Sequence, residues 1–137
     1  MIKSEEAGIR LAALRARRRK RWQRAGNNRK GTPVPKVAVM VKTKTQPGKR
    51  DEVRRLWDVH LRPRVEVNAA QEVYFFCEDA HDADTFYLFE IYSDSDALSA
   101  NAGSEWFAEY LQAVSPLLAG PGEVGIATPV WAKGVQM

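Results

Sequence analysis

The sequence contains few of the residues on which disulfides, metal sites and membrane anchors depend. One of its 137 residues is a cysteine, Cys77, so the chain cannot form an internal disulfide or a metal site built from several cysteines. No apolar run approaches the roughly 18 residues that are needed to cross a bilayer, and no secretory signal stands near the start. We therefore expect a soluble, cytoplasmic protein without a transmembrane segment.

Charge is distributed unevenly along the chain. Residues 1–33 contain 11 basic and 2 acidic residues, a net charge of +9, whereas residues 34–137 contain 10 basic and 15 acidic residues, a net charge of −5. We therefore predict a basic N-terminal extension over residues 1–33 and a single, mildly acidic domain over residues 34–137. A chain of this length is typical of one domain.

The basic extension has two interpretations. Its alanines and arginines favour a helix from about Glu5 to Arg24, although like-charge repulsion along Arg17 to Arg21 opposes that helix in isolation. The arginines could make weak contacts with an anionic partner such as a phosphate backbone or a lipid surface, with Trp22 adding stacking. The alternative is a flexible solubilising tail, or residues translated from a start codon upstream of the true one.

Hydrophobic periodicity predicts the element order βαββααβ for the domain. A strand over 36–45 leads through a Pro-Gly turn to a helix that begins near Asp51, and Pro63 should kink or loosen the last turn of that helix. Two apolar runs on either side of an acidic loop predict a hairpin. A helix capped by Ser93 or Asp94 should follow. The two strands of the predicted hairpin cover residues 72–78 and 85–93. A further helix is predicted from Glu105 to Leu118, and a final strand over 124–135.

This order predicts an α+β fold, in which helices pack on one face of an antiparallel sheet. The run over 85–93 is apolar on both of its alternating faces, interrupted by Glu90. Such a strand should be covered on both sides, and the usual cover for the outer face is a second copy of the chain. We therefore expect a homodimer in which two sheets meet as a two-fold symmetric barrel, with the final strand helping to join the subunits.

Two segments resemble the antibiotic biosynthesis monooxygenase family. "TKTQPGKRDEVRRL" (43–56) is similar to the family's strand, Pro-Gly-Lys turn and helix, and "DTFYLFEIYSDSDALSANAGSEWFAEYL" (84–111) is similar to its central signature. The resemblance covers roughly residues 36–133. It implies a ferredoxin-like α+β fold, a dimeric α/β barrel, and a cofactor-independent monooxygenase that acts on a small phenolic or quinol-type aromatic substrate.

The resemblance departs from the family's pattern at both histidines of the central signature. Asn101 stands in place of the helix histidine, and Trp106 stands in place of the second histidine. Glu90 matches the strand glutamate, and Tyr92 replaces the tryptophan that follows it. Ser104 and Phe107 match the remaining signature positions. The family's Glu-Pro-Gly-Cys turn is replaced by "EVNAAQ" (66–71), where Asn68 could adopt the left-handed conformation of a glycine.

Three residues are candidates for the chemistry that the resemblance implies. His60 lies on the apolar face of the first helix, where an imidazole could accept a proton or simply pack. Glu90 could accept a proton if it is buried, or could form an ion pair with an arginine, for example from a second copy. Asn101 could donate a hydrogen bond to a substrate anion, or could cap the end of its helix.

Five aromatic residues could clasp a flat ligand or could form part of an ordinary core. They are Trp57, Tyr74, Tyr92, Trp106 and Phe107. We expect neither a metal ion nor a cofactor, because this oxygenation requires of the protein a dry pocket, a proton acceptor and groups that hold an anion. The alternative function is a non-catalytic, small-ligand-binding or stress-associated domain of the same fold, which the absence of both motif histidines favours.

Overall fold

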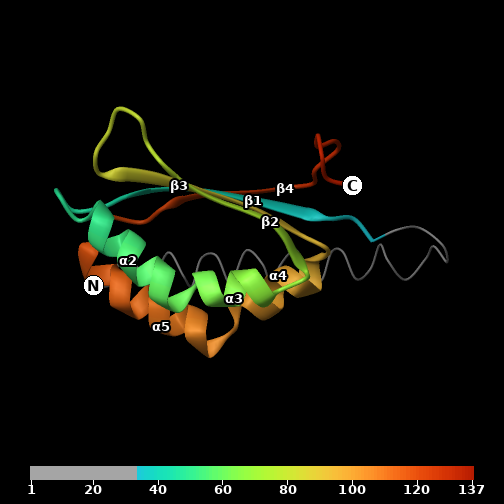
Figure 1. Ribbon diagram of the computed structural model, residues 1–137, viewed down its shortest axis with the longest axis horizontal. Helices are drawn as coiled ribbons and strands as arrows, with labels where there is room; N and C mark the ends of the chain where they lie inside the picture. The colour runs from blue at the N-terminus through green and yellow to red at the C-terminus, as the bar shows by residue number, and fades with distance from the viewer. Residues whose placement is uncertain (1–33) are drawn as a thin grey trace.

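The computed structural model describes residues 34–137, so the basic extension, its predicted helix and its anionic contact lie outside the described residues. These residues form a four-stranded antiparallel sheet with helices against one face (Figure 1). This arrangement confirms the predicted ferredoxin-like α+β fold. Within residues 34–137, no helix is long and apolar enough to cross a membrane.

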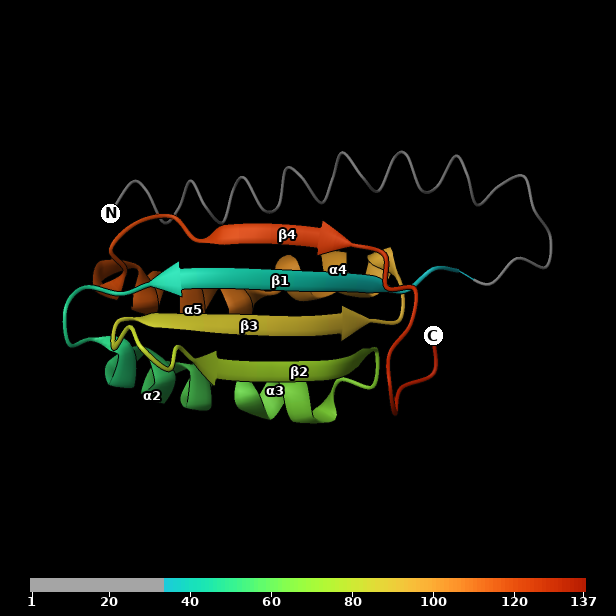
Figure 2. The ribbon, with the colours of Figure 1, turned by 90° about the horizontal axis from the view of Figure 1, so that it is seen from above.

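The sheet has the strand order β2-β3-β1-β4, which Figure 2 shows face-on. Alternating apolar residues form β1, and the two aromatic runs form the predicted hairpin of β2 and β3. The final strand ends at residue 127, earlier than predicted, because Pro129 follows and cannot donate to a strand ladder. The strands are β1 (Val37–Lys44), β2 (Gln71–Glu78), β3 (Thr85–Tyr92) and β4 (Glu123–Ala127).

The first predicted helix is divided into two at Leu61. Helix α2 (Arg50–His60) is followed by α3 (Arg62–Val67), and Pro63 lies in the first turn of α3. Pro63 has no backbone N–H to continue the α2 ladder, but this is no loss in the first turn of a new helix. Pro63 therefore begins a second helix, where the sequence predicted a loosened last turn of the first.

The turn before β2 does not use a left-handed residue. Asn68 is extended, with φ of −88° and ψ of 94°, and the only positive φ angles in residues 34–137 belong to glycines. Its Oδ1 instead accepts a 3.1 Å hydrogen bond from the backbone N–H of Ala70. The expectation of a left-handed Asn68 is therefore wrong, because its side chain closes the turn by a local hydrogen bond.

The second pair of helices begins at the predicted cap. Helix α4 (Ser95–Ala102) starts after Asp94, whose carboxylate accepts a 2.7 Å hydrogen bond from the backbone N–H of Ala97. Helix α5 (Glu105–Val114) ends before the predicted Leu118. Pro116 cannot supply the next α-helical donor, so the chain tightens into the 3₁₀ turn η1 (Ser115–Leu117).

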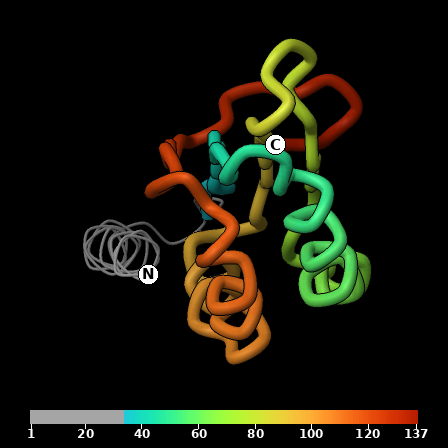
Figure 3. Tube along the Cα trace, turned by 90° about the vertical axis from the view of Figure 1, so that its left-hand side faces the viewer, coloured from blue at the N-terminus to red at the C-terminus, as the bar shows by residue number. Residues whose placement is uncertain are grey.

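The core fills the space between the sheet and the helices. Helices α2 and α5 lie side by side beneath the sheet, as the end-on view in Figure 3 shows. Burying each large apolar side chain in this layer contributes about 1.5–3 kcal/mol to stability. One buried cluster consists of Val53, Leu61, Phe86, Tyr110 and Val114, and the other of Val37, Val39, Tyr92 and Leu98.

Candidate ligand-binding site

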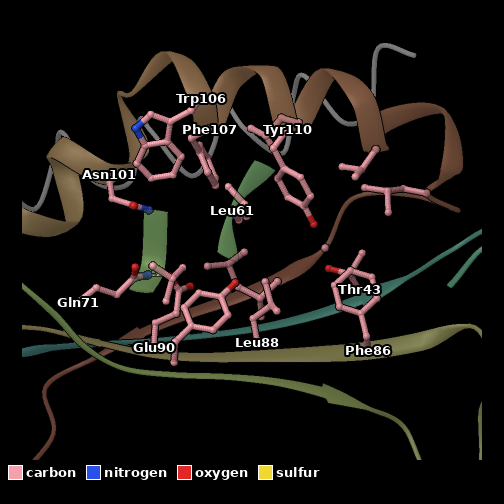
Figure 4. A pocket seen from close by; sticks show the side chains of 18 residues that line it. Thr43, Leu61, Gln71, Phe86, Leu88, Glu90, Asn101, Trp106, Phe107 and Tyr110 are labelled. Atoms are coloured by element: carbon pink, nitrogen blue, oxygen red, sulfur yellow. Dashed lines mark hydrogen bonds between the residues drawn. The ribbon is translucent and has the colours of Figure 1, made fainter. Parts of the chain in front are cut away.

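A cavity of about 110 Å³ remains between the sheet and the helices. Figure 4 shows side chains of α4 and α5 reaching into it from one side and side chains of the sheet from the other. An apolar cavity of about 150 Å³ can hold one benzene ring, so this space has the order of size of a single aromatic ring. Most lining residues are apolar. The polar ones are Thr43, Gln71, Tyr74, Glu90, Asn101 and Tyr110.

Gln71 and Glu90, which line one end of the cavity, form a hydrogen-bonded group with Tyr92 behind them. Nε2 of Gln71 donates to Oε1 of Glu90 at 2.8 Å and to the hydroxyl of Tyr92 at 2.9 Å. The Tyr92 hydroxyl in turn donates to Glu90 Oε1 at 2.6 Å. All three side chains are buried, and Glu90 is only 7% exposed. The cavity thus contains a carboxylate held in place from behind by two donors.

A strand irregularity brings Gln71 into this group. Gln71 pairs with Tyr92 and Val73 pairs with Ile91, so one extra residue is accommodated between Gln71 and Val73. This shift places Gln71 on the helix-facing side with Tyr92, whereas Val73 falls on the opposite side. Oε1 of Gln71 is buried and has no hydrogen-bond partner among residues 34–137.

Asn101 lies in the last turn of α4 and points into the cavity toward Gln71 (Figure 4). It is 8% exposed. Its backbone carbonyl accepts a 2.7 Å hydrogen bond from Ser104 Oγ, whereas its carboxamide forms no hydrogen bond within the described part of the chain. The helix cap is Gly103. The interpretation of Asn101 as a helix cap is therefore wrong, and its carboxamide is available to a ligand.

Two tyrosine hydroxyls complete the polar lining. Burial, and then the negative charge of Glu90, raise the pKa of Tyr110 and Tyr74 well above that of a free tyrosine. Both therefore remain neutral hydrogen-bond donors at physiological pH. Trp57 stands behind the cavity wall, where its Nε1 donates to the Tyr74 hydroxyl at 2.9 Å and its ring lies 5.6 Å from the Tyr74 ring.

Trp106 separates the cavity from a shallow depression on the outer side of the helices. It lines both spaces, and Phe107 meets it edge-on with ring centroids 6.5 Å apart. The guanidinium of Arg64 lies 5.9 Å from the Trp106 ring centroid, within the range of a cation–π contact. The indole thus forms the wall that the two spaces share.

His60 lines the outer depression and is absent from the cavity lining. Adjacent helical residues point about 100° apart, so the neighbouring Leu61 reaches the cavity while His60 does not. His81 is exposed in the loop between β2 and β3. His60, a candidate proton acceptor in the sequence, therefore lies outside the cavity.

The structure brings together five of the eight residues that the sequence singled out. Glu90, Asn101, Tyr74, Trp106 and Phe107 line the cavity, while Trp57 and Tyr92 support it from behind and His60 lies apart. The sequence singled out neither Gln71, which lies in the segment that replaces the family's turn, nor Tyr110. Within residues 34–137, no three side chains of His, Cys, Asp or Glu are grouped closely enough to hold a metal ion.

The fold is shared with proteins of known structure. Rv0793 of Mycobacterium tuberculosis is 28% identical with a TM-score of 0.64, and the match covers 72% of this chain and 99% of that one. A proposed antibiotic biosynthesis monooxygenase from Caulobacter crescentus CB15 is 22% identical with a TM-score of 0.66, over 72% and 93% of the two chains. PA3566 of Pseudomonas aeruginosa is 20% identical with a TM-score of 0.65, over 74% and 100%.

Comparison at the level of sequence gives no further assignment. No protein-family profile matches the chain, and no curated protein is detectably similar to it. The resemblance seen in the sequence is confirmed as a likeness of fold. The chain shares the fold of structures that include proposed antibiotic biosynthesis monooxygenases.

Proposed function

We propose that this protein is a monooxygenase that oxidises a small phenolic or quinol-type aromatic substrate without a cofactor. The observation that carries the proposal is the largely apolar cavity with Glu90 and Asn101 at one end. An apolar cavity accepts a flat ring, and the two polar side chains can act on a ring hydroxyl. The single Cys77 supports the cytoplasm, a reducing compartment, as its location.

The chemistry assigns a separate role to each polar residue. The substrate hydroxyl gives its proton to the Glu90 carboxylate, and the carboxamide N–H of Asn101 stabilises the resulting oxyanion. The anion then passes one electron to dioxygen, and the two radicals combine to a hydroperoxide at a ring carbon that carries hydrogen. Protonation and loss of water leave a carbonyl there, so one oxygen atom enters the substrate and the other leaves as water.

A homodimer is part of the proposal, supported by the sheet face that points away from the helices. No helix of residues 34–137 covers this face (Figure 1), and Phe75 and Met40 are 56% and 42% exposed on it. An exposed apolar face of this kind marks an interaction site, and a second copy presenting the same face would close a two-fold barrel. One paired row, Phe75–Phe89–Met40–Gly125, crosses the sheet here, whereas Ile91 and Ala38 of the neighbouring row are already buried within the chain.

A non-catalytic ligand-binding domain is the second candidate. It is favoured by the cavity lining, which contains neither His60 nor His81. An imidazole titrates near neutral pH and is the usual proton acceptor in such a site, whereas Glu90 is held by two hydrogen bonds. The same cavity could therefore bind a phenolic ligand without turning it over.

Oxygen uptake separates the two candidates. The full chain, with a metal chelator present, is incubated with a panel of quinols and anthrones, and an active enzyme consumes one dioxygen per substrate. Glu90→Gln keeps the shape of the side chain, so the rate should fall by roughly 10²- to 10⁴-fold if Glu90 is the proton acceptor. Glu109→Gln, which makes the same change on the exposed face of α5, is the control. Saturable binding without oxygen uptake would instead support the second candidate, a non-catalytic ligand-binding domain.

A further inference from the structure

We infer that Gln71 selects the ligand, and that the cavity takes a single aromatic ring whose hydroxyl or N–H group donates a hydrogen bond to Gln71 Oε1. The inference rests on the proposed function in one respect, because that function assigns an aromatic ligand to this cavity. It adds the number of rings, the kind of polar group and the residue that recognises it.

The side-chain oxygen of Gln71 is buried without a partner among residues 34–137. The residue is 7% exposed and lines the cavity, yet its Oε1 has no hydrogen-bond partner among residues 34–137. A buried acceptor without a partner destabilises the empty protein. A ligand that supplies a donor at this point removes that cost, whereas a ligand without a donor leaves it in place.

Glu90 sets the orientation of the Gln71 carboxamide. Its nitrogen faces the carboxylate of Glu90 at 2.8 Å, and a carboxylate can only accept hydrogen bonds. If the amide were reversed, its oxygen would face the Glu90 oxygen and two acceptors would meet. The orientation is therefore fixed from behind, and the amide atom left without a partner in the described part of the chain is the buried acceptor Oε1.

Asn101 lies on the wall of the cavity opposite Gln71. The carboxamide of Asn101 reaches toward Gln71 from α4 (Figure 4), and it too forms no hydrogen bond within the described residues. One hydroxyl group between them can donate to Gln71 Oε1 and accept from the Asn101 N–H group. An ether oxygen in the same position can accept from Asn101 but has nothing to donate to Gln71.

The cavity volume sets the number of rings. About 110 Å³ is of the order that one benzene ring occupies, and three fused rings exceed it. Phe107 and Tyr110 on the helix side and Leu88 on the sheet side bound the space. The substrate class that follows is a monocyclic phenol or quinol, as distinct from a polycyclic anthrone.

The test compares phenol with methoxybenzene, which has the same ring but no donor. Binding to the full chain is followed by tryptophan fluorescence, since Trp106 lines the cavity. We expect phenol to bind at least about tenfold more tightly than methoxybenzene, because a site with a buried unpaired acceptor rejects ligands that lack the donor. 2-Hydroxyanthracene, with three fused rings, should bind at least about tenfold more weakly than phenol, because it exceeds the cavity.

A variant pair assigns the preference to Gln71. Gln71→Met keeps the length of the side chain without the acceptor and should bring the phenol-to-methoxybenzene ratio close to one. Gln112→Met, the same change at an exposed position of α5, should leave the ratio unchanged. Equal affinities of phenol and methoxybenzene for the unaltered protein would overturn the inference, as would binding of neither, and these measurements do not depend on whether Gln71→Met folds.

Failure of the proposed function gives a different result. If no phenol causes oxygen uptake while phenol still binds more tightly than methoxybenzene, the monooxygenase activity is wrong and the role of Gln71 stands. If oxygen is consumed but 2-hydroxyanthracene binds as well as phenol, the activity stands and the single-ring inference is overturned.

Discussion

The hydroxyl of Tyr92 donates a 2.6 Å hydrogen bond to Glu90 from a completely buried position behind the cavity. The two residues lie on β3 and both extend toward the helices. Gln71 donates to the same carboxylate oxygen and to the Tyr92 hydroxyl, so the three groups hold one another. Tyr92 is therefore a positioning residue, because it fixes the carboxylate without touching the cavity.

Replacement of Tyr92 by phenylalanine should destabilise the protein. Tyr92→Phe removes a donor to a carboxylate and an acceptor for Gln71, and hydrogen bonds to charged groups contribute about 1.5–3 kcal/mol. Tyr110→Phe is the matched control, since the Tyr110 hydroxyl forms no hydrogen bond within residues 34–137 and its loss should change stability little. Urea unfolding measures both. Equal midpoints for the two variants would contradict the positioning role.

The acidic loop between β2 and β3 should make stability depend on pH. The hydroxyl of Tyr87 and the backbone N–H groups of Asp82 and His81 donate to Asp79 and hold its pKa well below its usual range. Because the pKa is lower in the folded state, this carboxylate stabilises the protein above about pH 4, the unfolded value, and the effect is lost as the pH falls through the folded value.

The measurement is the melting temperature between pH 7 and pH 2. Asp79→Asn should lower the melting temperature at neutral pH and make the decline below about pH 4 shallower than in the unaltered protein. Asp51→Asn is the control, because Asp51 is exposed at the start of α2 and forms no hydrogen bond within the described part of the chain. An unchanged acid decline in Asp79→Asn would show that the loop is not responsible.

The sequence was sufficient to predict the fold because period and turn chemistry are local properties. Alternation identified β1 and the hairpin, and Asp94 capped α4 as expected. The errors in the predicted lengths of the helices occurred at prolines. Pro63 divided the first helix and Pro116 shortened the last, since a residue without a backbone N–H ends one ladder and suits the first turn of the next.

The site was less accessible to prediction because it depends on relations between distant elements. The face on which Gln71 lies is decided by its pairing with Tyr92 on another strand, and this pairing leaves no signal in the periodicity. The direction of His60 depends on where α2 ends, and a shift of one residue on a helix turns a side chain by about 100°. Glu90 and Asn101 were predicted because the resemblance located them independently of packing.

The outer face of the sheet should control assembly. Phe75→Lys places a charge in the exposed apolar row, next to Phe89 at a ring distance of 6.3 Å, and should turn a dimer into a monomer at micromolar concentration. Val67→Lys, on a residue that is 80% exposed on α3, makes the same chemical change away from the sheet and should leave the dimer intact. Light scattering distinguishes these states. A monomeric unaltered protein would refute the proposed interface.

Replacement of Asn101 should affect turnover and leave folding almost unchanged. If its N–H group holds the substrate anion, Asn101→Ala should reduce turnover by about 100-fold, the scale of one lost oxyanion donor. Stability should stay within about 0.5 kcal/mol, because the carboxamide forms no hydrogen bond within the described residues and Gly103 is the helix cap. Gln112→Ala, which removes an exposed carboxamide from α5, is the control for both measurements.

Asn101→His restores an imidazole at the position where the resembling family carries one. The new side chain would lie near Glu90 in the cavity and could accept the substrate proton, so activity should rise with a pH midpoint of about 6 to 7. A rise with that midpoint would mean that the cavity has the geometry for a histidine and works with a weaker base. If the histidine variant and Asn101→Ala both match the unaltered protein in binding, turnover and melting temperature, Asn101 does not contact the substrate, and the polar end of the cavity acts through Gln71 and Glu90 alone.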